Sequence, residues 1–465
     1  MELQSNPQLL WFIGIYAILM VSVGIYMSKK VSNSADFILA GKSLGPIVLM
    51  GTLLATWTGS GSISGGETSV AYSFGIIPSL LLMIPTVIGI FILYIIAPKI
   101  RAFGKYTISG ILEAKYGSTA RNIASVIVIL AYVGIVSYQM TGLGFILNIT
   151  TGMSVELGTI IAAILIIFLA MIGGLRSVSQ TDAISGFLMV GGLLITVPII
   201  ISVAGGWDTI VSNVPESHLT STGGLTTIQL MGYLIPSLFL LLSDQNMYQR
   251  LAASNSDRSS KKAAISWLIV MLLISPAISI IAFTSRSLFP DIDPGMALMA
   301  TTTALPLGVG GILLAAAAAF IITTGNSYLL SAATNMTYDV YGKYINKHPS
   351  DKQQLLMTKV FIVVLGVISF LLISFFPTVL EVQMYSYTVY GAGITPAILA
   401  VFFWKRVTAI GGISSMIAGV ITTLVWELVL QTPFEINSSV ISVPVAIIVL
   451  IIVSLITQKH SNVQS

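Results

Sequence analysis

Long apolar stretches, each of about 20 residues, recur along the whole chain. A helix needs about 20 apolar residues to cross the hydrocarbon core of a bilayer, whereas barrel strands alternate over about ten residues. The pattern therefore predicts an all-α polytopic membrane protein with about 13 transmembrane helices. The expected spans are residues 9–28, 45–73, 75–97, 122–147, 156–174, 180–203, 227–246, 262–284, 308–336, 357–376, 379–404, 408–430 and 438–457.

The amino-acid composition excludes several classes of protein. Only 8% of the 465 residues are charged, which is about a third of the share in soluble domains and excludes a soluble enzyme or a disordered chain. The chain has no cysteine, which excludes thiol catalysis, cysteine zinc sites, iron–sulfur clusters and disulfides. We expect no organic cofactor, no nucleic-acid partner and a protein that acts as a monomer.

The basic residues predict an orientation. If the N-terminus lies outside, 20 of the 21 lysines and arginines fall in cytoplasmic connections, and only Arg286 falls outside. This segregation is the positive-inside pattern. The first apolar run has no basic residues before it, so we expect a retained helix and not a cleaved signal peptide. We therefore expect a plasma-membrane protein with its N-terminus outside and its C-terminus in the cytoplasm.

Two spans contain residues that interrupt helices. Residues 56–67 hold four Gly, three Ser and two Thr, and non-helical backbone at membrane depth is tolerated only where it is buried or lines a cavity. The alternative is a close helix–helix interface of small residues. Residues 227–246 contain Pro236 and end in the polar run 243–246. Because these spans lie five spans apart, they predict two inverted repeats, spans 2–6 and 7–11.

Two adjacent hydroxyl side chains, Thr323 and Thr324, lie at membrane depth in the span 308–336. Hard cations prefer oxygen ligands. Carbonyls freed by an interrupted span 2, together with these hydroxyls, would make a sodium site. The alternative is that both threonines hydrogen-bond to the preceding turn of their own helix.

Several segments of the chain resemble the sodium/solute symporter family, in family order and spacing. The most specific are the GGL…TD element at 173–182 and TPAILAVFFWK at 395–405. The other matching segments are 55–57, 65–75, 249–253 and 339–341. The resemblance implies a LeuT-type fold with a 5+5 inverted repeat and discontinuous helices, in a single transporter domain over 1–465. Its repeat core would cover 44–404, with peripheral helices and tail in 1–43 and 405–465.

The resemblance also implies the residues of a sodium site. The ligands would be the backbone carbonyls of Ala55, Thr58 and Phe320 and the hydroxyls of Thr323 and Thr324. Asp182 matches an aspartate on the family's cytoplasmic sodium exit path. The alternative role for Asp182 is a carboxylate stabilised by a helix N-terminus.

The substrate site is expected around the interrupted span 2. The apolar run 238–242 argues against a sugar, which leaves an amino acid, a quaternary amine or a carboxylate. Trp57 could contact a cation through its ring, or it could belong to ordinary aromatic packing. Glu67 could face a cationic substrate or a proton, or it could be wetted by an outer vestibule. The candidate substrate residues are Trp57, Glu67, Tyr138, Gln139, Leu240, Tyr385 and Thr388.

These features predict a sodium-coupled symporter that imports a small organic solute by alternating access. A proton-coupled or sodium-independent carrier of the same fold is the alternative. A channel would need a continuous polar pore, whereas the polar residues here cluster at mid-span breaks. An intramembrane enzyme is disfavoured because no catalytic motif is present.

Overall fold

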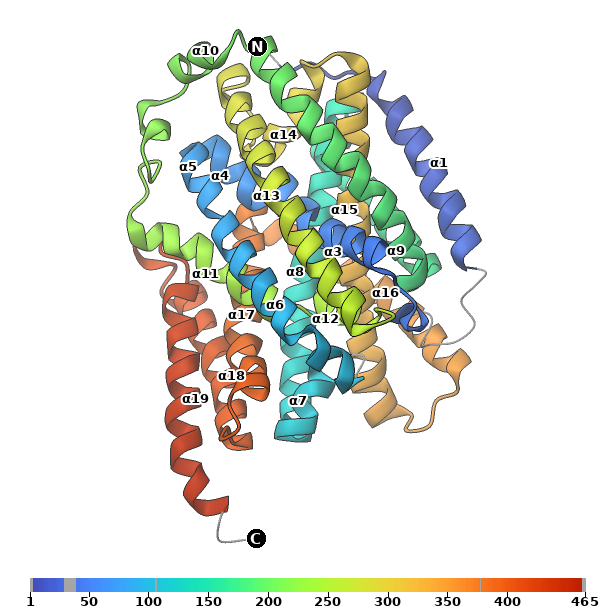
Figure 1. Ribbon diagram of the computed structural model, residues 1–465, viewed down its shortest axis with the longest axis vertical. Helices are drawn as coiled ribbons and strands as arrows, with labels where there is room; N and C mark the ends of the chain where they lie inside the picture. Colours follow the sequence, from blue (N-terminus) through green and yellow to red (C-terminus); the bar gives the residue numbers. More distant parts are fainter. Residues whose placement is uncertain (1–2, 29–38, 105–106, 377, 462–465) are drawn as a thin grey trace.

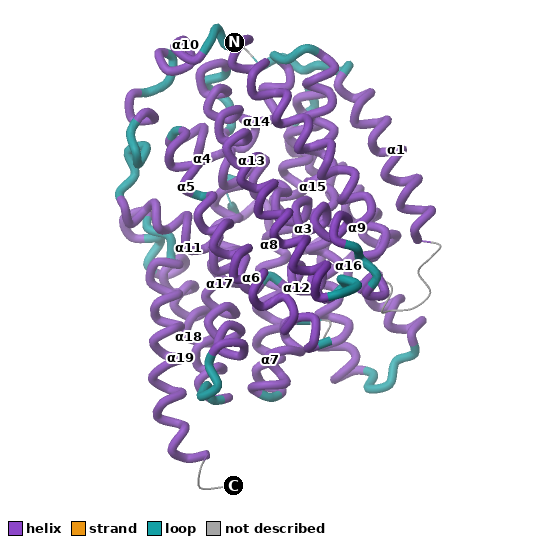
Figure 2. Tube along the Cα trace, in the orientation of Figure 1, coloured by secondary structure: helices purple, strands orange, loops and turns teal. Residues whose placement is uncertain are grey.

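The computed structural model describes residues 3–28, 39–104, 107–376 and 378–461 as a bundle of long helices (Figure 1). No strand occurs in these ranges (Figure 2). Within them, 12 helical segments are long and apolar enough to cross a membrane, and α1 (Leu9–Ser28) adds a helix with a shorter apolar stretch. The predicted all-α polytopic architecture is confirmed, and the count of about 13 spans is reached when α1 is included.

The helices that matter below have the following bounds: α3 (Pro46–Ser60), α4 (Gly66–Phe74), α6 (Met83–Phe103), α7 (Ile108–Tyr116), α8 (Ser118–Thr151), α9 (Val155–Val203), α11 (Thr227–Ser243), α12 (Gln245–Ala252), α13 (Asp257–Leu288), α15 (Leu307–Asn335), α16 (Asp351–Leu372), α17 (Val379–Phe403), α18 (Ala409–Leu424) and α19 (Ser439–Ser461). The long α9 contains two of the candidate spans, Val155–Ile172 and Val178–Val203.

Four spans form the centre of the bundle. The apolar windows of α3–α4 and α17 are 83% buried, and those of α8 and α15 are 78% and 72% buried. By contrast, the windows of α16 and α19 are only 28% buried. The outer faces of these peripheral helices are the apolar surfaces that lipid would cover.

Both predicted interruptions are present. Between α3 and α4, Gly59 has φ 0° and ψ −153°, and a π-helical turn follows at Gly61–Gly65. Between α11 and α12, Asp244 leaves the helical region with φ −56° and ψ 118°. Each span is therefore two half-helices, with the polar residues at the joint.

The packing partners of the helices repeat after five spans. α3 packs against α9 and α13, and α11, five spans later, packs against α17 and α6. α8 packs against α17, and α15, again five spans later, packs against α9. Each of these helices thus packs against the counterparts of the helices that its own counterpart contacts. Two interlocked repeats of five spans produce this pattern, as the spacing of the interrupted helices predicts. The limits 44–404 for the repeat core stay a prediction.

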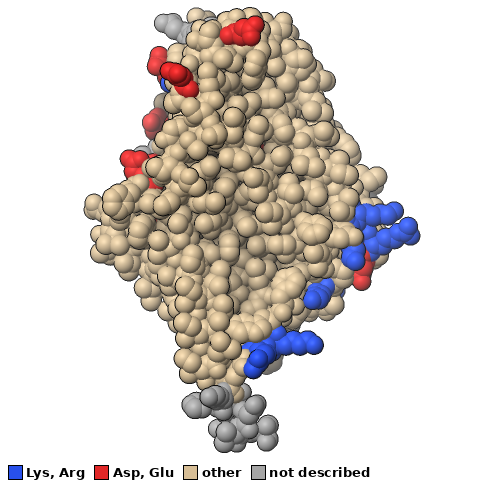
Figure 3. Space-filling model, turned by 60° about the vertical axis from the view of Figure 1, so that its left-hand side comes forward, with Lys and Arg blue, Asp and Glu red and all other residues tan. Residues whose placement is uncertain are grey.

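Charges separate along the long axis of the molecule. On the face shown in Figure 3, acidic side chains lie mainly toward the upper end and basic ones toward the lower end. The two termini lie at opposite ends (Figure 1). Arg250 does not follow the expected pattern: it lies on α12 and is fully buried, so its assignment to a connection is wrong.

Close contact between α3 and α9 gives a test of this packing. A Cβ added at Gly51 of α3 would lie 2.5 Å from the Cα of Ala183. We expect Gly51→Ala to lower the free energy of unfolding by about 1–3 kcal/mol, because the two backbones must separate. Gly191→Ala on α9 is the control, since nothing lies within 4 Å of its added Cβ. Thermal unfolding in detergent should show a lower Tm for Gly51→Ala only; equal Tm values would contradict the packing.

Candidate functional site

The break in α3 brings a backbone carbonyl against a threonine of α15. The turn at Gly59 ends the regular hydrogen bonding of α3. The Thr324 hydroxyl donates to the Ala55 carbonyl at 2.9 Å. Thr324 therefore bonds across to the broken helix and not to the preceding turn of its own helix, which was the alternative. A Cβ at Gly59 would lie 2.3 Å from the Thr324 Oγ1, so glycine is required for this close approach.

The other expected sodium ligands lie on the same two helices, Thr58 on α3 and Phe320 and Thr323 on α15. Thr323 follows the alternative, because its hydroxyl donates to the Phe320 carbonyl of its own helix at 3.3 Å. The Thr58 carbonyl accepts from the Gly61 N–H in the turn after the break. All five candidate residues are at most 2% exposed. The cluster thus supplies carbonyl and hydroxyl oxygens from two helices in a site closed to lipid, which is the chemistry a hard cation requires.

A small cavity lies beside the same break. It measures about 30 Å³, which is room for about one water molecule. Trp57 and Glu67, both expected in the substrate site, line it. The rings of Trp57 and Tyr387 stack with their centroids 6.3 Å apart. The residues lining the cavity are Trp57, Gly61, Ser62, Gly66, Glu67, Leu82, Thr86, Ser237, Gln383 and Tyr387.

Glu67 is the only carboxylate among the described residues that line this cavity. Its Oε1 accepts a hydrogen bond from the Ser275 hydroxyl at 2.7 Å, while its Oε2 has no hydrogen-bond partner among the described residues. The side chain is 5% exposed, so wetting of Glu67 by an outer vestibule is disfavoured. A buried carboxylate oxygen without a partner can accept a hydrogen bond or a cationic group from a solute.

The remaining expected substrate residues lie at varying distances from the cavity. Tyr138 contacts it indirectly, through its hydroxyl at 3.3 Å from the Tyr387 hydroxyl. Gln139 lies behind it and accepts from the Ser60 N–H at 2.9 Å. Leu240 is fully buried and is absent from the lining of this cavity. Thr388 donates to the Asn437 side chain at 3.0 Å, also away from the cavity.

Tyr385 lines a larger outer cavity of about 650 Å³ near the start of α17. This outer vestibule carries four carboxylates and, among its described lining residues, no lysine, arginine or histidine. Partial burial raises the pKa of one of them, Asp293, above its usual value, although the Gly295 N–H that donates to it opposes the rise. The other three are Glu381, Glu427 and Glu435. A vestibule of this charge attracts cations.

Sequence reasoning missed the role of Gln383. Its Nε2 donates to the Gly61 carbonyl at 3.0 Å, and its Oε1 accepts from the Gly66 N–H at 2.8 Å. One amide therefore bonds to backbone on both sides of the π-helical turn. The available signal was a polar residue in a central span, four positions before Tyr387 and so on the same helix face.

A second missed residue is Arg250, which lies at the centre of a buried polar cluster. Its Nη2 lies 3.6 Å from the Asp182 Oδ2 and donates to the Ser327 hydroxyl at 2.7 Å. The Thr52 hydroxyl donates to the same Asp182 oxygen at 2.5 Å. Asp182 also lies beside Thr323, so the residue expected on the sodium exit path does adjoin the candidate sodium site.

A family model described as the sodium:solute symporter family matches residues 37–419. The chain belongs to this family. Among curated relatives, the osmoregulated proline transporter of Bacillus subtilis (strain 168) is 26% identical over 438 residues, covering 89% of this chain and 87% of that protein. The sodium/proline symporter of Escherichia coli (strain K12) is 25% identical over 455 residues, covering 91% of this chain and 88% of that protein.

The fold is also found among solved structures. A Na⁺-coupled sialic acid symporter in a substrate-bound outward-open state superposes with a TM-score of 0.81 at 21% identity, over 97% of both chains. The expected LeuT-type fold is confirmed. Because the family and the relatives are transporters, this member of the sodium:solute symporter family is a transporter and not an enzyme.

The buried ion pair gives a test of the polar cluster. Arg250→Met leaves the Asp182 carboxylate buried without its cation, so we expect a loss of about 3–5 kcal/mol of unfolding free energy. Lys343→Met is the control, since its ion pair with Glu113 at 3.0 Å is partly exposed and exposed pairs contribute about 0–1 kcal/mol. Adding Asp182→Asn to Arg250→Met should restore part of the loss in a thermal unfolding assay. Equal stability of the two single variants would contradict the pairing.

Proposed function

We propose that the protein couples the inward movement of Na⁺ to uptake of a small solute with a cationic nitrogen, such as an amino acid or a quaternary amine. The observation that carries the proposal is the Thr324–Ala55 hydrogen bond of 2.9 Å, beside a cavity lined by Trp57 and Glu67. Sodium between α3 and α15 would hold the two helices together and order the break that forms the cavity wall.

Three features support a cationic nitrogen in the solute. The stacked rings of Trp57 and Tyr387 offer aromatic faces, which attract cations. The Glu67 Oε2 has no hydrogen-bond partner among the described residues, so it can accept a hydrogen bond from an ammonium group of the solute. The described lining of the cavity includes no lysine, arginine or histidine that would favour an anion. The proline transporters among the relatives carry a solute of this kind.

The driving force follows from the orientation that we propose. The basic end of the molecule faces the cytoplasm and the acidic vestibule faces outward, in agreement with the positive-inside rule. An inward-negative potential contributes about 2.3 kcal/mol per elementary charge per 100 mV, more than tenfold in accumulation. We further propose that the chain functions as a monomer in the plasma membrane.

Removing the two hydroxyls tests the sodium site. Thr323→Ala with Thr324→Ala should weaken Na⁺ activation of solute binding by at least about tenfold, because two of the oxygen ligands are lost. Thr334→Ala is the matched control on the same helix, since its hydroxyl bonds only to its own helix, at the Leu330 carbonyl. The measurement is thermal stabilisation of purified protein by proline, betaine, a dicarboxylate or glucose, in Na⁺ and in K⁺. Unchanged Na⁺ dependence in the double variant would refute the site.

A second variant tests the solute class. Glu67→Gln keeps a group that can bond Ser275 but removes the charge, so we expect affinity for a cationic or zwitterionic solute to fall by about tenfold or more. Glu435→Gln in the exposed part of the vestibule is the control, because solvent and salt screen its charge. Stabilisation by a ligand equally in Na⁺ and K⁺, and lost in Glu67→Gln, would instead support the proton-coupled alternative.

A further inference from the structure

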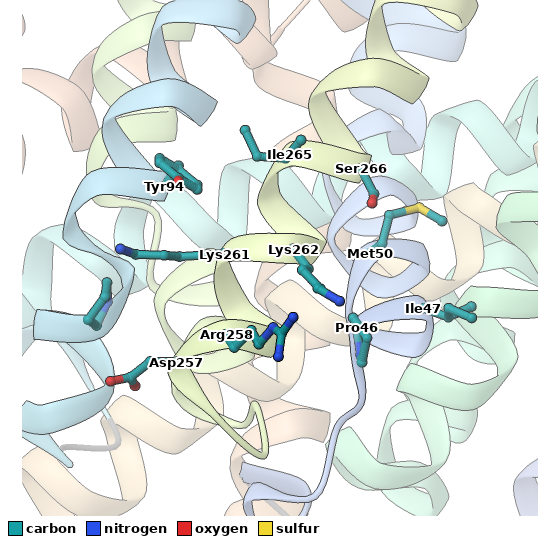
Figure 4. A pocket seen from close by; sticks show the side chains of 11 residues that line it. Pro46, Ile47, Met50, Tyr94, Asp257, Arg258, Lys261, Lys262, Ile265 and Ser266 are labelled. Atoms are coloured by element: carbon teal, nitrogen blue, oxygen red, sulfur yellow. The ribbon is translucent and has the colours of Figure 1, made fainter.

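A wide groove opens on the outside of the bundle, at its basic end. It has a volume of about 940 Å³ and lies between α3, α6 and α13. Figure 4 shows side chains from all three helices around it. Its lining residues are Pro46, Ile47, Met50, Tyr94, Pro98, Asp257, Arg258, Lys261, Lys262, Ile265 and Ser266. The groove lies away from the break and from the outer vestibule, so neither coupling nor solute recognition accounts for it.

Three basic side chains line the groove, and none of them forms an ion pair with another described residue. Arg258, Lys261 and Lys262 all come from the first turns of α13 (Figure 4). Asp257 is the only acidic residue among the described residues of the lining, and it pairs with Arg101 at 2.9 Å. No ion pair joins the three cations to any other residue that the structure describes. With respect to the described residues, the groove therefore presents three positively charged side chains without an ion-pair partner.

Apart from Asp257 and Ser266, the rest of the groove lining is apolar or aromatic, and it continues onto exposed apolar surface. Ile47 is 64% exposed and Ile265 is 38% exposed, and the Lys261 ammonium lies 5.5 Å from the centroid of the Tyr94 ring. Farther along the same helices, Phe91 and Ile269 are each 54% exposed. A free anion would use the cations and leave this surface bare, whereas a phospholipid would cover both.

We propose that this groove binds an anionic phospholipid, with its phosphate group among Arg258, Lys261 and Lys262 and its acyl chains along the exposed faces of α6 and α13. Basic pockets between transmembrane helices at the cytoplasmic side are suited to anionic headgroups. Long lysine side chains place their charge at the membrane interface while their stems cover apolar surface. This proposal does not depend on the identity of the transported solute.

The groove also lies next to a backbone contact between the two repeats. Just before α3, the Leu44 N–H donates to the Ala253 carbonyl at 3.1 Å, and the Asn255 N–H donates to the Leu44 carbonyl at 3.0 Å. These bonds tie the start of α3 to the chain between α12 and α13. A lipid that contacts Pro46 and Lys262 would add a second link between α3 and α13 at the same level.

The experiment is titration of the purified full chain, in uncharged detergent, with phosphatidylglycerol, phosphatidylcholine or inorganic phosphate, followed by thermal shift. Phosphatidylglycerol should stabilise the protein and the other two should not. The variant Arg258→Gln/Lys261→Gln/Lys262→Gln should bind phosphatidylglycerol roughly a hundredfold more weakly, since each cation contributes about fivefold.

The matched control removes three charges elsewhere at the basic end, as Lys347→Gln/Lys352→Gln/Lys359→Gln, and should keep the affinity within about threefold. If the groove variant does not fold, the double variant Arg258→Gln/Lys262→Gln removes two exposed side chains and should weaken binding about 25-fold. Equal stabilisation by phosphatidylcholine, an equal shift with inorganic phosphate, or unchanged binding in the groove variant would each overturn the proposal.

Discussion

The structure depends on how the broken backbone of α3 is satisfied inside the membrane. A helix that stops at membrane depth exposes N–H and C=O groups that lipid cannot pair. Here Gln139 accepts from the Ser60 N–H, Gln383 bonds to backbone at Gly61 and Gly66, and Thr324 donates to the Ala55 carbonyl. Side chains from α8, α17 and α15 thus replace the missing helical hydrogen bonds. These three helices are also among the most buried spans, so satisfying the break fixes which helices form the centre.

The second break is satisfied differently. Asp244 lies at the joint of α11 and α12, where its carboxylate accepts from the hydroxyls of Tyr132 and Tyr328 at 2.6 and 2.5 Å and from the Asn246 N–H at 2.8 Å. The first break is therefore satisfied by amide and hydroxyl side chains beside the cavity. The second is satisfied by one carboxyl group that two tyrosine hydroxyls contact. The first span of each repeat is interrupted in the same way, but different kinds of side chain satisfy the two interruptions.

Local sequence patterns were sufficient for the spans and both breaks, because hydrophobic runs and Gly, Pro and Ser clusters act on the backbone where they occur. They also placed Trp57 at the first break, whereas the contact of Thr324 with Ala55, 269 positions away, was expected from the family resemblance. They could not identify Gln383 or Arg250, because the partners of these side chains lie far away in the chain: 322 positions separate Gln383 from Gly61. Leu240 was expected in the substrate site from the apolar run around it. In the structure its side chain is buried and does not line the cavity beside the break.

The Thr324–Ala55 contact joins helices of different repeats, and this has a thermodynamic consequence. Any movement that separates α3 from α15 lengthens the contact. The affinity of the site for a cation therefore depends on the distance between the two helices. Linkage is reciprocal: if the cation raises the affinity of the neighbouring cavity for its solute by some factor, the solute raises the affinity for the cation by the same factor. In the proposed site, the cation and the solute therefore each favour binding of the other. Their concentrations and association rates decide which of the two binds first.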